Sequence, residues 1–445
     1  MKRVQVIFAT GVSAVVTLAF ATDASALPVF ARKYRTSCTT CHIGFFKLNP
    51  FGEAFRQNGY SIPGGQEARL VKEEPVSLGA EAWKRVFPDA VWPGAIPSNV
   101  PVAFYAHQRI FVDENASPGN PTTNFKFPHE FKIFTGGIMG GPFSFWGEVD
   151  LEAANRSAGT VGSGLKRIFF QANDLFSEES WGRVGWLPED ALNLRAGLID
   201  IGVLAQPLNV RRTINKPLPY TYAVADGWDL GDLSSGFEAN GVLLHRVKYN
   251  AGVVNGTTTG TPTGVFDENN VKDLYYRAAY KHGGLSFDGK DWAGAEGSEL
   301  KQSDNWVDNA ITVGQFGYFG TSTLTGPFHN QFWRLGWDAR VNVGDLDLYG
   351  AIIKGRDNKP STTVRDLDTW SWFVEADYVL FPWLQPAIRY EQVTYDKAFA
   401  RDVDNLILSL LMWPRANIKL TLEGLIPLED SDANSQLLVD LTYAF

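Results

Sequence analysis

Cysteine and methionine are scarce in this chain: its 445 residues include two cysteines and three methionines. So few cysteines exclude a disulfide-rich scaffold and leave too few ligands for a structural zinc site. Long hydrophobic runs are missing as well. Beyond the N-terminus no stretch offers about 20 consecutive apolar residues, which argues against transmembrane helices. Basic tracts are also absent and the net charge is −9, so nucleic acid is not an expected partner.

The N-terminus has the pattern of a secretory signal peptide. Lys2 and Arg3 supply a positive start, a broken apolar stretch follows, and Ala24-Ser25-Ala26 has the small-x-small pattern of a cleavage site. We therefore predict a signal peptide over residues 1–26 and export of the mature chain. A membrane anchor is the alternative, but the apolar stretch is short and interrupted by Thr and Gly.

Both cysteines lie in one short motif, Ser37-Cys38-Thr39-Thr40-Cys41-His42. A disulfide, a redox-active pair and a zinc site are three possible interpretations. A redox pair normally opens a helix in a βαβ unit, and no such alternation surrounds Cys38. The pattern C-x-x-C-H is that of covalent c-type haem attachment, in which His42 would be an iron ligand. We therefore expect one haem c, bound through Cys38, Cys41 and His42.

The residues around the motif predict a small helical domain over 27–66. Phe51 and Phe55 lie four residues apart, on one face of a short helix that is expected to end at a glycine, Gly59. A domain of about 40 residues is too small to bury a haem alone. The domain also carries a basic face, which would be either solvated or placed against carboxylates (Arg32, Lys33, Arg35, Lys47 and Arg56).

The remaining chain predicts a β-barrel. After a linker over 67–100, segments of about ten residues over 101–445 alternate apolar and polar side chains, as in Ser371 to Tyr378. Charged residues share the polar face, aromatic residues crowd the strand ends, and the chain ends on Phe445. Gly-rich stretches at 255–264 and 288–304 look like long external loops. The fold class is therefore mostly β: an outer-membrane antiparallel barrel of about 16 strands with a small N-terminal helical c-type haem plug. A soluble β-protein is the alternative.

The segment from Phe30 to His42, with Leu48 to Phe55 and Gly59-Tyr60, resembles the fused monohaem cytochrome–porins of iron-oxidising bacteria. The resemblance is specific over roughly 28–65 and only architectural over the barrel. It implies an outer-membrane electron conduit that takes electrons from an extracellular donor such as Fe(II) and passes them to a periplasmic c-type cytochrome. Outward electron flow, or a solute-specific porin with a structural or sensory haem, are the alternatives. No Ser/His/Asp set suggests bond-making catalysis, so enzymatic activity beyond possible Fe(II) oxidation stays open.

A low-spin haem needs a second axial ligand, and the N-terminal domain offers no methionine or second histidine between Ile43 and Pro101. Lys33, Lys47 or water would be weaker ligands. On the expected first strand, His107 alternates with apolar residues in the same way as Tyr105 and Arg109, so all three side chains are expected to point into the lumen. We therefore predict His107 as the sixth ligand. The other candidate ligands occupy the same alternate positions as apolar residues and are therefore expected to point outward to lipid, although a bulge would reverse this (Met139, Met412, His129, His245, His282 and His329).

Overall fold

The computed structural model describes most of the chain from Val29 onward. The described residues are 29–44, 46–64, 67–72, 76–77, 95–96, 101–113, 122–140, 143–152, 162–176, 186–223, 228–256, 269–292, 295–296, 299–300, 306–323, 329–397, 401–429 and 435–445. The predicted signal peptide, 1–26, lies outside the described residues, as does most of the predicted linker, 67–100.

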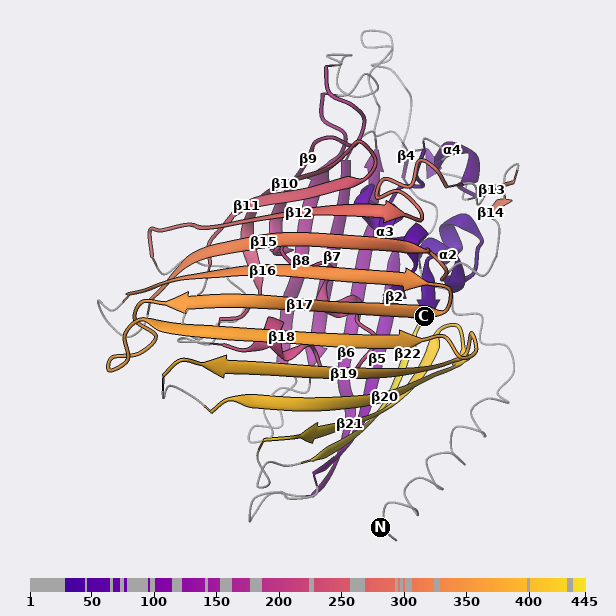
Figure 1. The fold of residues 1–445 in the computed structure, drawn as a ribbon. Coiled ribbons are helices and arrows are strands. Elements are labelled where there is room, and N and C mark those ends of the chain that lie inside the picture. The colour runs from indigo at the N-terminus through magenta and orange to yellow at the C-terminus, as the bar shows by residue number, and fades with distance from the viewer. Residues whose placement is uncertain are drawn as a thin grey trace.

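Sixteen antiparallel strands form one closed barrel, which confirms the predicted fold (Figure 1). The first strand, β5, pairs with the last, β22, so that the sheet has no free edge. The strands are β5 Val102–Asp113, β6 Thr123–Gly140, β7 Phe143–Glu152, β8 Gly162–Ala172, β9 Asn193–Asp200, β10 Leu233–Leu243, β11 Val247–Val254, β12 Asp273–Gly283, β15 Ala310–Thr323, β16 His329–Val343, β17 Leu346–Asp357, β18 Leu367–Tyr378, β19 Leu384–Tyr395, β20 Val403–Arg415, β21 Ile418–Pro427 and β22 Gln436–Ala444.

The two faces of the barrel wall differ as the alternation predicts. In β18, Glu375 and Asp377 are buried in the lumen, whereas Val374 and Tyr378 are 43% and 45% exposed on the outside. An outer face of this kind suits contact with lipid, and a lumen lined by charges does not suit the core of a soluble sandwich. The barrel therefore spans a membrane.

The two ends of the barrel are unequal. The connections at 244–246, 344–345 and 416–417 are tight turns, and they lie at the end where the chain terminates. Bacterial barrels carry their short turns on the periplasmic side, so this end is periplasmic. The prediction that 288–304 is an external loop was wrong. Its described parts, 288–292 and the short strands β13 Ala295–Glu296 and β14 Glu299–Leu300, follow the end of β12 at the same periplasmic end.

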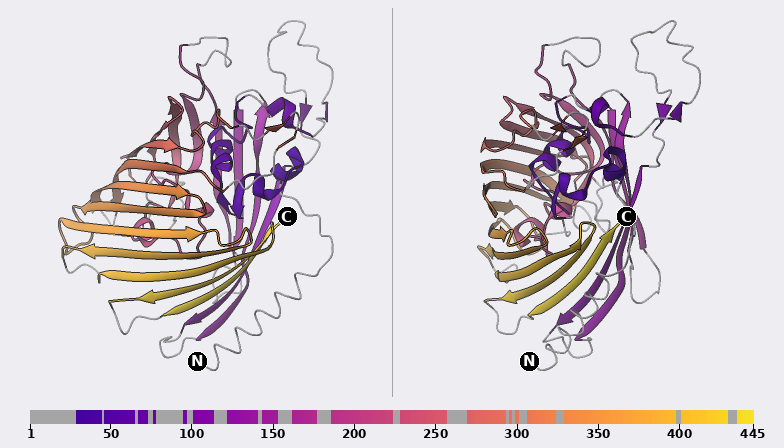
Figure 2. Two further views of the ribbon diagram at one scale, coloured as in Figure 1. Left: turned by 45° about the vertical axis from the view of Figure 1, so that its right-hand side comes forward. Right: turned by 90° about the vertical axis from the view of Figure 1, so that its right-hand side faces the viewer.

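The N-terminal segment sits in the periplasmic end of the barrel (Figure 2). It consists of α2 Val29–Tyr34, the 3₁₀ turn η1 Cys38–Thr40, the hairpin β1 His42–Gly44 with β2 Lys47–Leu48, α3 Pro50–Gln57 and α4 Glu67–Leu70, followed by β3 Val76–Ser77 and β4 Ala95–Ile96. Helix α3 is the predicted short helix: Asn49 caps its start, and Gly59 follows its end with a positive φ of 63°. None of the helices in the described residues is long and apolar enough to cross a membrane.

A long connection between β9 and β10 folds into the lumen. We call its described residues, 201–223 and 228–232, the inward loop; it contains η3 Leu208–Val210 and α5 Leu218–Thr221. Its apolar residues, Ile201 and Tyr220 among them, pack with barrel residues such as Phe332 and Phe373 in one buried cluster. The lumen is therefore filled by the N-terminal segment at one end and by the inward loop beside it.

Deleting Phe445 is expected to lower the yield of assembled barrel. The backbone of Phe445 donates to Phe104 O at 2.9 Å and accepts from Phe104 N at 2.6 Å, and the two rings stack with centroids 5.3 Å apart. These contacts extend the seam that closes the sheet. Heat-modifiable migration in gels and the membrane yield would measure the effect, and a normal yield of the deletion variant would contradict it.

Candidate functional site

The structure brings Cys38, Cys41 and His42 together in one tight turn. Cys38 opens the 3₁₀ turn, Cys41 follows it and donates from its backbone N–H to Cys38 O at 3.2 Å, and His42 begins β1. Both cysteines are free thiols rather than a disulfide. The three side chains predicted from sequence are therefore presented from one small piece of backbone.

Asn49 holds this turn in place, and sequence reasoning did not single it out. Its amide donates to Thr40 O at 3.0 Å, its Oδ1 accepts from Gly52 N at 2.8 Å, and its backbone N–H donates to Cys41 O at 3.0 Å. Asn49 is fully buried. A Cβ on Gly52 would lie 2.1 Å from Cys41 O, so only glycine lets α3 pack this close to the motif. The available signal was the helix-start pattern Asn49-Pro50.

His42 is set up as a neutral imidazole. Its Nδ1 lies 3.2 Å from Phe46 O, so Nδ1 carries the proton when it donates to this carbonyl and Nε2 then bears the lone pair. Burial lowers the pKa of His42 to about 4. A metal-binding histidine is neutral and has its second nitrogen oriented by such a bond.

The two thiols are kept protonated. Burial raises the pKa of Cys41 to about 12 and also raises that of Cys38 above its usual value. Burial leaves the thiols in the form that adds to a carbon–carbon double bond.

An apolar cavity of about 240 Å³ opens beside the motif, and we call it the motif cavity. The N-terminal segment provides one wall and the barrel the other. Aromatic rings dominate both walls, as an apolar flat ligand requires. The residues that line it include Cys38, Cys41, His42, Phe30, Phe46, Phe51, Phe55, Tyr60, Phe104, Phe134, Trp146 and Phe169, with Arg56, Arg167, Arg195 and Asp200.

Ion pairs fasten both the N-terminal segment and the inward loop to the barrel wall. Asp347 on β17 is the shared acceptor. Its carboxylate lies 3.5 Å from Lys47 Nζ, 3.6 Å from Arg212 Nη2 and 2.8 Å from Arg340 Nε. Arg340 also binds Glu53 of α3 at 2.8 Å. Lys47, one residue of the predicted basic face, therefore lies against a carboxylate of the lumen wall and is not solvated.

The pKa values of the segment's own charges reflect this docking. Burial, together with the nearby Arg340, lowers the pKa of Lys47 to about 8. Burial alone would raise the pKa of Glu53, but Arg340 and Lys47 outweigh it, so the pKa of Glu53 is lowered. Both groups are therefore charged at neutral pH, as docking against the wall requires.

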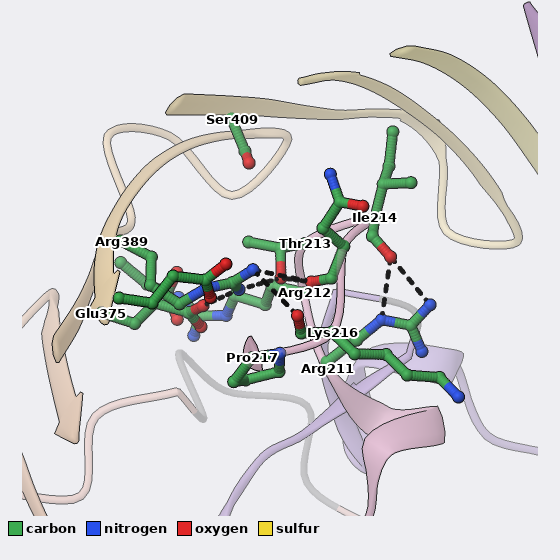
Figure 3. A network of polar contacts seen from close by, with 12 residues as sticks. Arg211, Arg212, Thr213, Ile214, Lys216, Pro217, Glu375, Arg389 and Ser409 are labelled. Atoms are coloured by element: carbon green, nitrogen blue, oxygen red, sulfur yellow. Dashed lines mark hydrogen bonds and ion pairs between the residues drawn. The ribbon is translucent and has the colours of Figure 1, made fainter. Parts of the chain in front are cut away.

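Hydrogen bonds and ion pairs hold the inward loop against the part of the barrel wall formed by β18, β19 and β21 (Figure 3). Arg389 donates to Thr213 Oγ1 and to Glu375, at 2.8 and 2.7 Å. The backbone N–H groups of Ile214 and Asn215 donate to both oxygens of Glu423, at 2.7 and 2.6 Å. The loop is thus a fixed part of the lumen wall.

His107 faces the lumen as predicted, but it lies in a second cavity. This cavity of about 720 Å³, which we call the charged cavity, shares Phe46, Phe134 and Arg167 with the motif cavity. His107 Nε2 lies 2.6 Å from Asp440 Oδ2. The structure therefore does not bring His107 together with Cys38, Cys41 and His42, and among the described residues no second histidine and no methionine line the motif cavity.

His129 also lines the charged cavity, so its predicted outward orientation was wrong. Its ring meets that of His107 edge to face, with centroids 4.7 Å apart. The cause is a shift in the pairing of β5 with β6 between His107 and Arg109. β5 advances by two residues while β6 advances by four, from Glu130 to Lys126, and His129 lies inside this irregular stretch, where the regular alternation is lost.

The assignment of His107 as the sixth ligand stays a prediction, and His107→Ala tests it. If His107 binds the iron, the oxidised haem of the variant changes from low-spin to high-spin in visible and EPR spectra. The neighbouring variant His129→Ala is the matched control and should leave the spectra unchanged. An unchanged low-spin spectrum in His107→Ala would place the ligand elsewhere and leave His107 as the partner of Asp440.

Comparison with known proteins supports the barrel. No protein-family model matches the chain. No curated protein matches it either. Among solved structures, OmpF of Salmonella typhi in complex with daunomycin matches with a TM-score of 0.55 at 12% identity. The match covers 77% of this chain and 97% of the OmpF chain. An anion-selective porin from Comamonas acidovorans matches with a TM-score of 0.54 at 12% identity, and the match covers 77% of this chain and 98% of the porin chain. The outer-membrane channel DcaP of Acinetobacter baumannii matches with a TM-score of 0.50 at 9% identity, and the match covers 77% of this chain and 96% of the DcaP chain. The chain therefore has a porin-like fold, in agreement with the predicted location in the outer membrane of a Gram-negative bacterium.

Proposed function

We propose that this chain is an outer-membrane electron conduit that carries one c-type haem, attached through Cys38 and Cys41, with His42 as an axial ligand. The observation that carries the proposal is the motif cavity. It gathers these three side chains between aromatic walls, inside the mouth of a porin-like barrel. Bound there, a haem supplies one-electron exchange at its iron.

The residues of the chain fit such a group. Each protonated thiol can add across a vinyl group and form a thioether, and this addition needs no oxidant. When His42 Nδ1 donates to Phe46 O, Nε2 is left as the nitrogen that would bind the iron. The aromatic walls, which include Phe51 and Phe55, would keep water from the macrocycle, and burial of this kind tunes a haem potential.

The proposed partners follow from the two sides of the membrane. Because the motif cavity lies at the periplasmic end, a periplasmic c-type cytochrome is the proposed acceptor. An extracellular donor such as Fe(II) would deliver electrons from the other side. The filled lumen supports a conduit rather than an open pore, because the inward loop and the N-terminal segment are both tied to the wall. Outward flow to an external acceptor would use the same site.

A solute-specific porin with a structural or sensory haem is the second candidate. The charged cavity favours it, since this cavity is about 720 Å³ in size and is lined by both acidic and basic side chains. The similarity in fold to porins favours it as well.

Two assays on the purified protein separate the candidates. In the first, the haem spectrum is followed while Fe(II) is added, and reduction of the haem is the expected result. In the second, the protein is placed in liposomes and swelling in isotonic solutes is recorded. Solute-dependent swelling without reduction of the haem would overturn the conduit and favour the porin.

A further inference from the structure

Charged side chains also line the motif cavity. Three arginines, Arg56, Arg167 and Arg195, and one acidic residue, Asp200, line it. Arg167 is bound to Asp200 at 2.5 and 2.8 Å and to Glu148 at 2.5 Å. Arg195 donates to Gln171 at 2.9 Å and lies 3.3 Å from Glu238. These two arginines are therefore held by the barrel wall.

Arg56 and Trp146 differ from these two. Arg56 Nε and Trp146 Nε1 are buried, and neither has a hydrogen-bond partner among the described residues. Arg56 comes from α3 and Trp146 from β7, so the two donors approach one cavity from opposite walls. A buried donor that is left without an acceptor destabilises the folded chain. Two such donors in one apolar cavity point to an acceptor that binds there.

The acceptor that fits is anionic. Arg167 and Arg195 are paired with carboxylates of the wall, whereas Arg56 forms no salt bridge with the described residues, so its positive charge calls for an anionic acceptor. A haem carries two propionate carboxylates on the edge opposite its vinyl groups. We propose that Arg56 and Trp146 bind the haem propionates, an inference that rests on the proposed function.

This assignment orients the haem in the barrel. Cys38 is partly exposed, whereas Arg56 also lines a neighbouring cavity together with Leu208 and Asp232 of the inward loop. The thioether edge of the haem would then lie at the motif, and the propionate edge would lie toward the inward loop. A positive charge beside the propionates stabilises the reduced haem, which has one positive charge fewer, and so raises its reduction potential.

The test uses the haem-loaded protein and its midpoint potential, measured by spectroelectrochemistry. Arg56→Gln is expected to disfavour reduction at least tenfold, a drop of about 59 mV for one electron. Arg56→Lys keeps the charge and should lie closer to the wild type. Trp146→Phe is expected to shift the propionate bending band in resonance Raman spectra while the haem content stays at one per chain. The matched controls are Arg356→Gln and Trp337→Phe, both at exposed positions, and they should change neither quantity.

An unchanged potential in Arg56→Gln together with an unchanged propionate band in Trp146→Phe would overturn the inference. If Arg56→Gln fails to mature, the Raman band of Trp146→Phe decides alone. Failure of the proposed function looks different, because wild-type protein would then lack haem, or its haem would not be reduced by Fe(II).

Discussion

Replacing Cys38 and Cys41 together by alanine is expected to remove all covalently bound haem. The two thiols are the only cysteines in the chain, so no other side chain can form a thioether. The wild-type protein, made in a host that matures c-type haems, should show a band when a denaturing gel is stained for haem peroxidase activity. The double variant should show none.

A matched control lies inside the same motif. Thr39 is exposed and its hydroxyl contacts Ser37, so Thr39→Ala should keep both haem and stain. A colourless wild-type protein would contradict the assignment of the motif. A stained band in the double variant would show that the attachment runs through another residue.

Replacing Asp347 by alanine is expected to release the N-terminal segment from the lumen. The side chain is 5% exposed and neutralises three cations, Lys47, Arg212 and Arg340. Removing one partner of a buried ion pair costs about 3–5 kcal/mol, because the other charges stay buried without compensation. We therefore expect a barrel that still assembles but whose N-terminal segment is loosely held.

Limited trypsin digestion measures this release. Lys47 is 3% exposed in the docked state, so the bond after it resists cleavage in the wild type and should be cut rapidly in Asp347→Ala. Asp345 is exposed in the adjacent turn, and Asp345→Ala is the matched control. Equal resistance of Asp347→Ala and the wild type would show that other contacts hold the segment.

Sequence alone predicted the features that depend on neighbouring residues. The alternation in Ser371 to Tyr378 has the period of a strand whatever it pairs with, so the strands and their inward charges were predictable. The motif from Cys38 to His42 is contiguous, and its three side chains converge through local backbone alone. The same holds for the short helix after Asn49, whose cap and first turn are adjacent in the chain.

The tertiary structure decided what depends on pairing between distant segments. A register shift between β5 and β6 turned His129 into the lumen, and the path of the barrel brought 288–292 to the periplasmic end. Asp347 meets Lys47 across 300 positions of sequence, and no local pattern marks such a partner. The physical reason is that parity and capping are set by adjacent peptide units. Register, barrel closure and the burial of a charge are set by contacts between residues far apart in the chain.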